Sequence, residues 1–328
     1  MTQGHPASAG TAIASPTMAA ADAFAARHAQ FWRLGWLLLW MSGTLISFVV
    51  AAVSVRALAE SLNAFEIMSV RSAGGIAILL VMGLAHPQLL HSVTLRHMRM
   101  QFLRNAAHFG SQICWTIAIM VLPFATVFAL EFTIPAWVTL LAVLFLSERM
   151  TLTRATALAI CCVGVLIILR PGFEAFKPAA LVMIVGALLF AVAAVITKRL
   201  VVTESTFSIM LWMNLMQLPM NLAGSDPGFL LRLDHTMVLP LIGIAVAGLA
   251  IHYCLANAFR YGDAMIVVPM DFLRVPLIAA IGWLFYGEHV DAFVFAGAAI
   301  IIAGVVWNIH GEAQRGLQLK QPVMQPAE

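Results

Sequence analysis

Residues 180–197 read ALVMIVGALLFAVAAVIT, a run of eighteen residues without a charged side chain. A helix needs about 20 apolar residues to cross the hydrocarbon core of a bilayer, so this run predicts a membrane-spanning helix. The composition of the whole chain agrees, because 62% of its 328 residues are hydrophobic and 10% are charged. Ordinary soluble domains carry about 25% charged residues. No soluble fold of this size can bury so much apolar surface, and the sequence therefore predicts an integral membrane protein.

Nine further apolar runs complete a predicted set of ten transmembrane helices. The expected spans are 34–55, 67–85, 102–122, 124–146, 152–169, 180–197, 207–222, 238–259, 265–285 and 292–309. The more polar residues 1–33 and 311–328 are interpreted as disordered cytoplasmic tails.

The distribution of Lys and Arg predicts the orientation of these spans. With the N-terminus inside, twelve basic residues fall in cytoplasmic segments and four in external loops. Cytoplasmic loops of membrane proteins carry the excess of Lys and Arg. We therefore expect a multi-pass protein of the inner (plasma) membrane with both termini in the cytoplasm.

The chain also matches itself when it is shifted along its own length. At a shift of 140 residues Glu131 falls on Asp271 and Gly164 on Gly304, and at a shift of 142 Arg56 falls on Lys198. Each predicted half, 34–170 and 180–310, contains five spans, so the second half must enter the membrane upside down. The predicted fold is an all-α membrane protein of two inverted five-helix repeats, an architecture typical of secondary transporters.

Three short motifs resemble those of the drug/metabolite transporter superfamily, EamA type. They are Leu146-Ser147-Glu148-Arg149 with the following Leu169-Arg170-Pro171-Gly172, Phe65-Glu66 with Arg71, and Tyr286-Gly287-Glu288. The resemblance implies ten helices in inverted repeats and a central cavity formed mainly by the first four helices of each half. The second half departs from the pattern at Met213, where Arg71 would repeat, and at His289, where Arg149 would repeat. Glu148 and Glu288, at helix ends on opposite sides of the membrane, are assigned a structural or gating role.

Four charged residues lie deep inside predicted spans: Arg71, Glu131, Asp271 and Arg274. Such residues are costly in lipid and usually face a bundle interior or a wet cavity. Asp271 and Arg274 are three residues apart and share a helix face, so they can pair. That pair is either structural or opens for a charged solute. Glu131 has no charged neighbour on its own helix and is interpreted as a contact for a proton or a substrate ammonium.

Polar stripes on the third and seventh spans complete the candidate site. They either line a shared aqueous cavity or tie helices together by hydrogen bonds. The candidate substrate-binding or coupling residues are Arg71, His108, Gln112, Trp115, Glu131, Asn214, Gln217, His252, Asp271 and Arg274.

These features predict a secondary transporter that moves a small polar or zwitterionic, amino-acid-like metabolite across the plasma membrane by alternating access. Export is the favoured direction, and an uptake permease for a metabolite or vitamin is the alternative. An intramembrane enzyme is disfavoured because the Gly-x-Ser-x-Gly and His-Glu-x-x-His motifs are absent. No metal, cofactor or nucleic acid is expected. The expected partners are a small solute and membrane lipid, while proton coupling and a monomeric or homodimeric state stay open.

Overall fold

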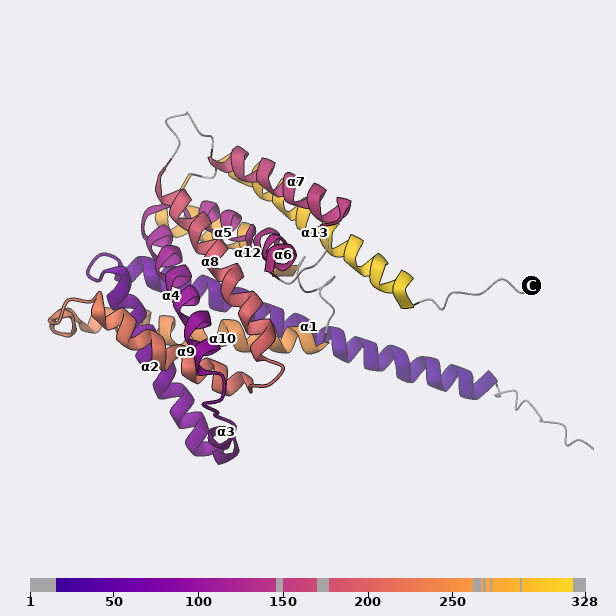
Figure 1. The fold of residues 1–328 in the computed structure, drawn as a ribbon, viewed down its shortest axis with the longest axis horizontal. Coiled ribbons are helices and arrows are strands. Elements are labelled where there is room, and N and C mark those ends of the chain that lie inside the picture. The colour runs from indigo at the N-terminus through magenta and orange to yellow at the C-terminus, as the bar shows by residue number, and fades with distance from the viewer. Residues whose placement is uncertain are drawn as a thin grey trace, which may run out of the picture.

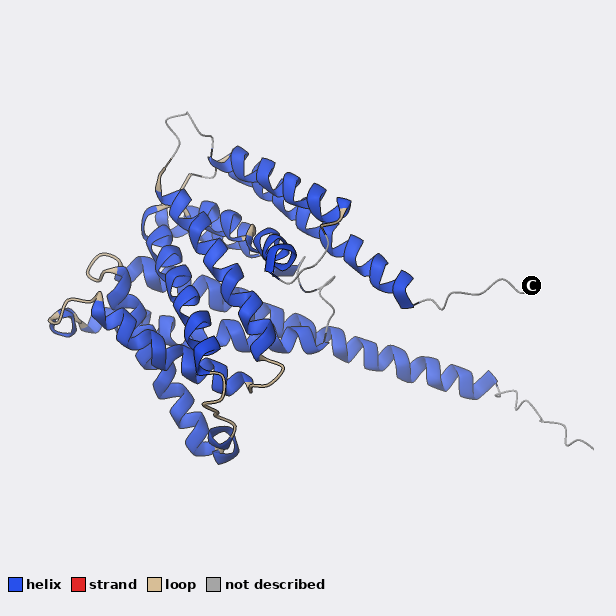
Figure 2. Cartoon of the chain, viewed as in Figure 1, coloured by secondary structure: helices blue, strands red, loops and turns tan. Residues whose placement is uncertain are grey.

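The computed structural model describes residues 16–145, 150–169, 177–261, 267, 270–271, 273–289 and 291–320. Within these residues every regular element is helical (Figure 2). The first-half helices are α1 Pro16–Leu58, α2 Ala64–Ala85, α3 Pro87–His91, α4 Met98–Val121, α5 Phe124–Glu131, α6 Ile134–Phe145 and α7 Leu152–Leu169. The second-half elements are α8 Ala179–Leu200, α9 Thr206–Ala223, η1 Phe229–Arg232, η2 His235–Met237, α10 Val238–Tyr261, α12 Arg274–Tyr286 and α13 Ala292–Lys320. The motifs at 146–149 and 170–172, including Glu148, lie outside the described residues.

About ten helical segments are placed to cross the membrane. Five are long and apolar enough by length and composition: Leu34–Leu58, Ala64–Ala85, Phe124–Leu141, Ala179–Leu200 and His235–Ala258. Three shorter apolar helices follow the same pattern: Leu152–Ile168, Arg274–Tyr286 and Ala292–Asn308. Helices α4 and α9 occupy the remaining two predicted spans, and both bury polar side chains. The predicted all-helical membrane fold is confirmed.

The two ends of the chain differ from the prediction. Helix α1 begins at Pro16, so residues 16–33 are helical where a disordered tail was expected. Alanines dominate this segment and favour a helix, and proline is well tolerated at a first helical position. Helix α13 likewise continues to Lys320, beyond the expected end at residue 309. The start of α1 and the end of α13 project in the same direction, as an even number of crossings requires (Figure 1).

The helices pack with the symmetry expected of two inverted repeats. Helix α1 packs along α10 and α8 packs along α4, while α7 pairs with α13 and α2 with α9. When each helix is replaced by its counterpart in the other repeat, the α1–α10 pair becomes the α8–α4 pair. The α7–α13 and α2–α9 pairs are converted into themselves. Asn63 and Ser205, which are 142 positions apart, cap α2 and α9 through their side chains.

Buried glutamates fasten the loops at the two ends of the bundle. Glu66, at the start of α2, forms an ion pair with Arg232 from the segment between α9 and α10. Glu204, between α8 and α9, accepts hydrogen bonds from Thr94 Oγ1 at 2.6 and 2.7 Å and lies 3.0 Å from His97 Nδ1. Burial raises the pKa of the Glu204 carboxyl, but the hydrogen bonds from Thr94 and His97 outweigh burial and hold that pKa below its ordinary value. Glu204 is therefore ionised at neutral pH.

The contact between α7 and α13 depends on two glycines, Gly164 and Gly297. A Cβ atom on Gly297 would lie 2.6 Å from the Gly164 carbonyl oxygen and 2.5 Å from Ile168 Cγ1. We expect Gly297→Ala to push the helices apart and to lower the free energy of unfolding by about 1–3 kcal/mol. Thermal unfolding of the purified protein in detergent measures the effect.

Gly35 on α1 is the matched control, since nothing lies within 4 Å of a Cβ atom there. Gly35→Ala is expected to leave the melting temperature unchanged or to raise it, because alanine is the better helix former. Equal melting temperatures for the two variants would contradict this account of the α7–α13 contact.

Candidate functional site

The fourth membrane segment is broken in the middle, although a continuous span over 124–146 was predicted. Helix α5 ends at Glu131, and α6 begins three residues later. Thr133 Oγ1 donates to the Leu130 carbonyl at 2.7 Å across the break. Pro135 explains the interruption, because it has no N–H for the Glu131 carbonyl and its ring would clash with that carbonyl in a continuous helix.

The ninth segment is interrupted at the equivalent place. Met270 and Asp271 are helical, Leu273 is in a turn, and α12 starts at Arg274. Pro276 lies in the first turn of α12, whereas Pro269 is outside the described residues. Because Asp271 is the repeat mate of Glu131, both halves break beside a carboxylate. Broken membrane helices occur where protein or a cavity satisfies the freed backbone groups, and transporters place substrate and ion sites there.

Arg274 joins the two breaks. Its Nη1 lies 3.2 Å from Glu131 Oε1, and its Nη2 lies 3.3 Å from Asp271 Oδ2. Trp115 Nε1 donates to Glu131 Oε2 at 3.1 Å. The spacing-based prediction that Asp271 and Arg274 pair is therefore confirmed. Glu131 has no charged neighbour on its own helix, but it does form an ion pair. Its partner, Arg274, comes from the other half of the chain.

Aromatic rings cover the Arg274 guanidinium. Its central carbon lies 4.3 Å from the ring centroid of Phe48 and 4.6 Å from that of Phe132. A planar guanidinium suits such stacking, and the attraction grows when water is excluded. The carboxylates and the rings together hold Arg274 in one orientation at the interface of the repeats.

A cavity of about 90 Å³ lies between the two halves, bounded by α1, α2, α4, α5, α6, α8 and α10. Its polar lining consists of Arg71, Ser111, Gln112, Trp115, Glu131 and His252. Such a volume holds several water molecules, each of which needs roughly 10–15 Å³. Pockets that enclose an organic ligand measure about 300–1,000 Å³. The structure therefore shows a compact form that must expand to admit a metabolite.

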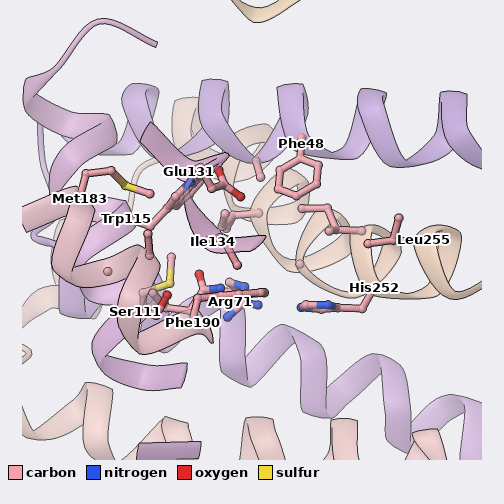
Figure 3. Close-up of a pocket in the computed structure, with 18 residues that line it drawn as sticks. Phe48, Arg71, Ser111, Trp115, Glu131, Ile134, Met183, Phe190, His252 and Leu255 are labelled. Atoms are coloured by element: carbon pink, nitrogen blue, oxygen red, sulfur yellow. Dashed lines mark hydrogen bonds between the residues drawn. The ribbon is translucent and has the colours of Figure 1, made fainter. Parts of the chain in front are cut away.

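Basic and acidic groups occupy different sides of this cavity. Arg71 and His252 lie along one side, while Glu131 and Trp115 lie on the other (Figure 3). The His108 ring centroid is 6.0 Å from that of His252 and extends the basic side toward α4. Among the candidates, Arg71, Gln112, Trp115, Glu131 and His252 thus line the cavity, and Asp271 and Arg274 adjoin it through Glu131.

The polar stripe of α9 does not line the cavity. Asn214 Nδ2 donates to its own helix, to the Met210 carbonyl at 2.8 Å, and packs against Gly75 of α2. Gln217 Nε2 donates to His108 Nδ1 of α4 at 2.8 Å. Of the two alternatives for the stripes, hydrogen bonding between helices describes Gln217 of α9 and His108 of α4, while Ser111, Gln112 and Trp115 of α4 line the cavity.

Sequence reasoning missed two aromatic residues of the site. Phe48 and Phe190 both line the cavity, and Phe190 lies 5.8 Å from the His108 ring between centroids. The chain contains 20 phenylalanines, and no pattern separates these two from those that face lipid or core. Pro135, by contrast, was an available signal for the break at Glu131.

An ionic network lies at the end of the bundle opposite the termini. Arg56 Nη1 lies 2.8 Å from Glu288 Oε1, and the guanidinium also donates to the Ile119 and Leu122 carbonyls at 2.7 and 2.6 Å. Glu288 Oε2 accepts the Phe124 N–H at 2.9 Å. The network links the ends of α1, α4 and α12 to the start of α5, and so joins the first half to the second.

A charged cavity between two inversely related five-helix halves, with a broken helix from each half beside it, defines a secondary transporter of small metabolites. The chain belongs to the EamA-like transporter family, whose profile matches residues 35–170 and 177–309. The predicted membership of the drug/metabolite transporter superfamily is confirmed, and the family is one of transporters, not of enzymes.

Several relatives are similar over most of the chain. A riboflavin transporter of Rhizobium johnstonii is 32% identical over 61% of this chain and 67% of its own length. An S-adenosylmethionine uptake transporter of Rickettsia felis is 26% identical over 85% of this chain and 92% of its own length. The pseudopaline exporter CntI of Pseudomonas aeruginosa is 28% identical over 79% and 91%. One solved crystal structure covers 88% of this chain and 99% of its own, with a TM-score of 0.55 at 15% identity, which supports the fold alone.

Proposed function

We propose that this transporter exports a small polar or zwitterionic, amino-acid-like metabolite across the plasma membrane, driven by exchange for protons. The observation that carries the proposal is the cavity between the repeats, which holds Arg71 and His252 on one side and Glu131 on the other. Groups of opposite sign facing one small space suit a solute that carries both an amine and a carboxylate. The riboflavin and S-adenosylmethionine transporters and the pseudopaline exporter also handle organic metabolites.

Alternating access fits the compact cavity. Loop contacts around Glu204 fasten one end of the bundle, and the Arg56–Glu288 network closes the other. The breaks at Glu131 and Asp271 divide two membrane segments into short pieces, which can tilt without bending an intact helix. The cavity would expand toward one side at a time as one end opens.

Proton coupling is assigned to the carboxylates around Arg274. Two carboxylates share one guanidinium, so the group carries a net negative charge when both are ionised. A proton on either carboxylate makes it neutral, as in other coupled acid pairs. Asp271 Oδ1 is buried and has no hydrogen-bond partner among the described residues, which leaves an atom to receive that proton.

The test is transport by purified protein in liposomes, with a panel of solutes and with or without a pH gradient. We expect Glu131→Gln and Asp271→Asn each to reduce proton-driven flux at least tenfold, and Asp271→Asn, whose residue does not line the cavity, to leave solute–solute exchange in place. Glu60→Gln, which removes an exposed carboxylate at the end of α1, should leave flux unchanged. Normal proton-driven transport by both site variants would contradict the assignment. The direction of net solute flux in vesicles of known orientation distinguishes export from the alternative of uptake.

The proposed topology places both termini in the cytoplasm. Lys177 and Lys198 flank α8 and are both exposed, so cysteines at these positions can be labelled by an impermeant maleimide. We expect Lys177→Cys to react from outside the cell and Lys198→Cys only after the membrane is opened. Reaction of both from the same side would contradict the ten-span arrangement.

A further inference from the structure

The basic side of the cavity contains a buried arginine without an acidic partner. Arg71 is 5% exposed, its side chain lines the cavity, and no carboxylate among the described residues pairs with it. Arg274, in contrast, forms ion pairs with two carboxylates, Glu131 and Asp271. An unpaired buried charge is expensive, and inside a membrane protein such a residue usually faces a water-filled site with a function.

The neighbours of Arg71 add positive charge or hydrogen-bond donors and no acid. Arg104, Arg71 and the two histidines lie within electrostatic range of one another. Arg104 is buried, and its hydrogen-bond partners, Thr197 Oγ1 at 3.1 Å and Asn105 Oδ1 at 2.7 Å, are neutral. The basic groups of this side therefore have no anion among the described residues to balance them.

The hydrogen bond between His108 and Gln217 sets which nitrogen of the imidazole is a donor. The Gln217 amide nitrogen can only donate, so Nδ1 of His108 accepts and the proton of the neutral ring is on Nε2. That Nε2 is buried and has no partner among the described residues. His108 thus adds an unsatisfied donor close to the ring of His252, which lines the cavity.

Helix α10 approaches Arg71 closely at a glycine. A Cβ atom on Gly248 would lie 2.6 Å from Arg71 Nε and 3.2 Å from its Cγ. The guanidinium is therefore held against the α10 backbone while it lines the cavity. This is a positioned group, not a long side chain free to leave the bundle.

We propose that Arg71, with the His252 and His108 rings beside it, binds an oxyanion group of the transported solute, either a carboxylate or a phosphate. A guanidinium presents a planar fork of donors that matches both groups. The inference rests on the proposed function and deepens it, because it assigns the anionic end of the solute to the first half of the chain. The carboxylates around Arg274 are left to the proton or to a cationic end.

The test uses small anions as probes and a readout independent of transport. Thermal unfolding of purified protein is measured with succinate or its neutral diamide succinamide, and with inorganic phosphate or its neutral trimethyl ester, at matched ionic strength. We expect at least one anion to raise the melting temperature by about 2–4 °C at ten times its dissociation constant, and its neutral mate to have no effect. The succinate and phosphate arms separate a carboxylate site from a phosphate site.

Arg71→Met should abolish this stabilisation, and Arg260→Met, which removes an exposed arginine at the end of α10, should keep it. Without ligand, Arg71→Met is expected to melt at the wild-type temperature or above, because it removes a buried charge that has no partner. Arg71→Lys keeps the charge but loses the fork, so it should retain part of the anion effect. A lower melting temperature of ligand-free Arg71→Met, or equal responses of wild type and Arg71→Met to every anion, would overturn the proposal.

Failure of the two proposals can be told apart. If liposomes show no flux of any solute but the Arg71-dependent anion effect persists, the transport proposal fails and the anion site stands. If flux occurs but no anion stabilises the protein through Arg71, the anion site alone is wrong.

Discussion

Arg274→Met is expected to lower the free energy of unfolding by about 3–5 kcal/mol and to abolish transport. The substitution keeps much of the side-chain volume but leaves Glu131 and Asp271 facing each other without their shared cation. Both carboxylates are largely buried in the present structure, at 3.2 and 3.3 Å from the guanidinium. Removing one member of a buried ionic group costs more than the group itself contributes, because the remaining charges stay desolvated.

A variant that removes all three charges of this group should rescue the stability that Arg274→Met loses. A triple variant with Glu131→Gln, Asp271→Asn and Arg274→Met has no buried charge at this place and should regain most of the lost stability. It should still fail to couple transport to a proton gradient, since no titratable group is left there. Melting temperatures in detergent, with a difference on the order of 10 °C between single and triple variants, check the first point, and liposome flux checks the second. Equal instability of the two variants would show that Arg274 acts through packing against the rings of Phe48 and Phe132.

The membrane architecture could be predicted from the sequence because each of its signals is local or repeats at a fixed offset. An uncharged run such as 180–197 identifies a span without knowledge of its neighbours. The match of Glu131 with Asp271 at a shift of 140 residues relates the halves in the same way, by comparison along the chain. The helix pairing seen in the structure, with α1 on α10 and α8 on α4, follows from that symmetry.

The partners of polar residues could not be predicted, because they depend on which helices touch. The side chains of Glu131 and Arg274 are 143 positions apart in the chain, and only packing of the halves brings them together. The stripes of α4 and α9 look alike in sequence, yet Gln112 lines the cavity and Gln217 ties α9 to α4. Their difference is a rotation of each helix about its axis, which no residue type encodes. The helical extension of α1 to Pro16, in contrast, follows from the alanine content of residues 16–33, which is a local signal.

Glu288→Ala is expected to open the end of the bundle opposite the termini. It removes the 2.8 Å ion pair with Arg56 and the acceptor for the Phe124 N–H at 2.9 Å, two contacts that join α12 to α1 and α5. Hydrogen bonds to charged groups contribute about 1.5–3 kcal/mol each, so losing even one shifts the equilibrium toward the open form about tenfold or more. Arg56 keeps its bonds to the Ile119 and Leu122 carbonyls, so α1 and α4 should stay together while α12 moves away.

Cysteine labelling measures this opening. Ser111 lines the cavity, so Ser111→Cys in a background without the four native cysteines reports on access to it. An impermeant maleimide added on the Arg56 side should react about tenfold faster when Glu288→Ala is present. Asp234→Asn, which removes an exposed carboxylate of η2 in the segment that precedes α10, is the matched control and should not change the rate. Unchanged labelling in Glu288→Ala would mean that Arg56 and Glu288 stabilise the fold without closing the cavity. Faster labelling with slower net transport would instead identify the network as the gate, because a cavity held open on one side cannot complete the cycle that alternating access requires.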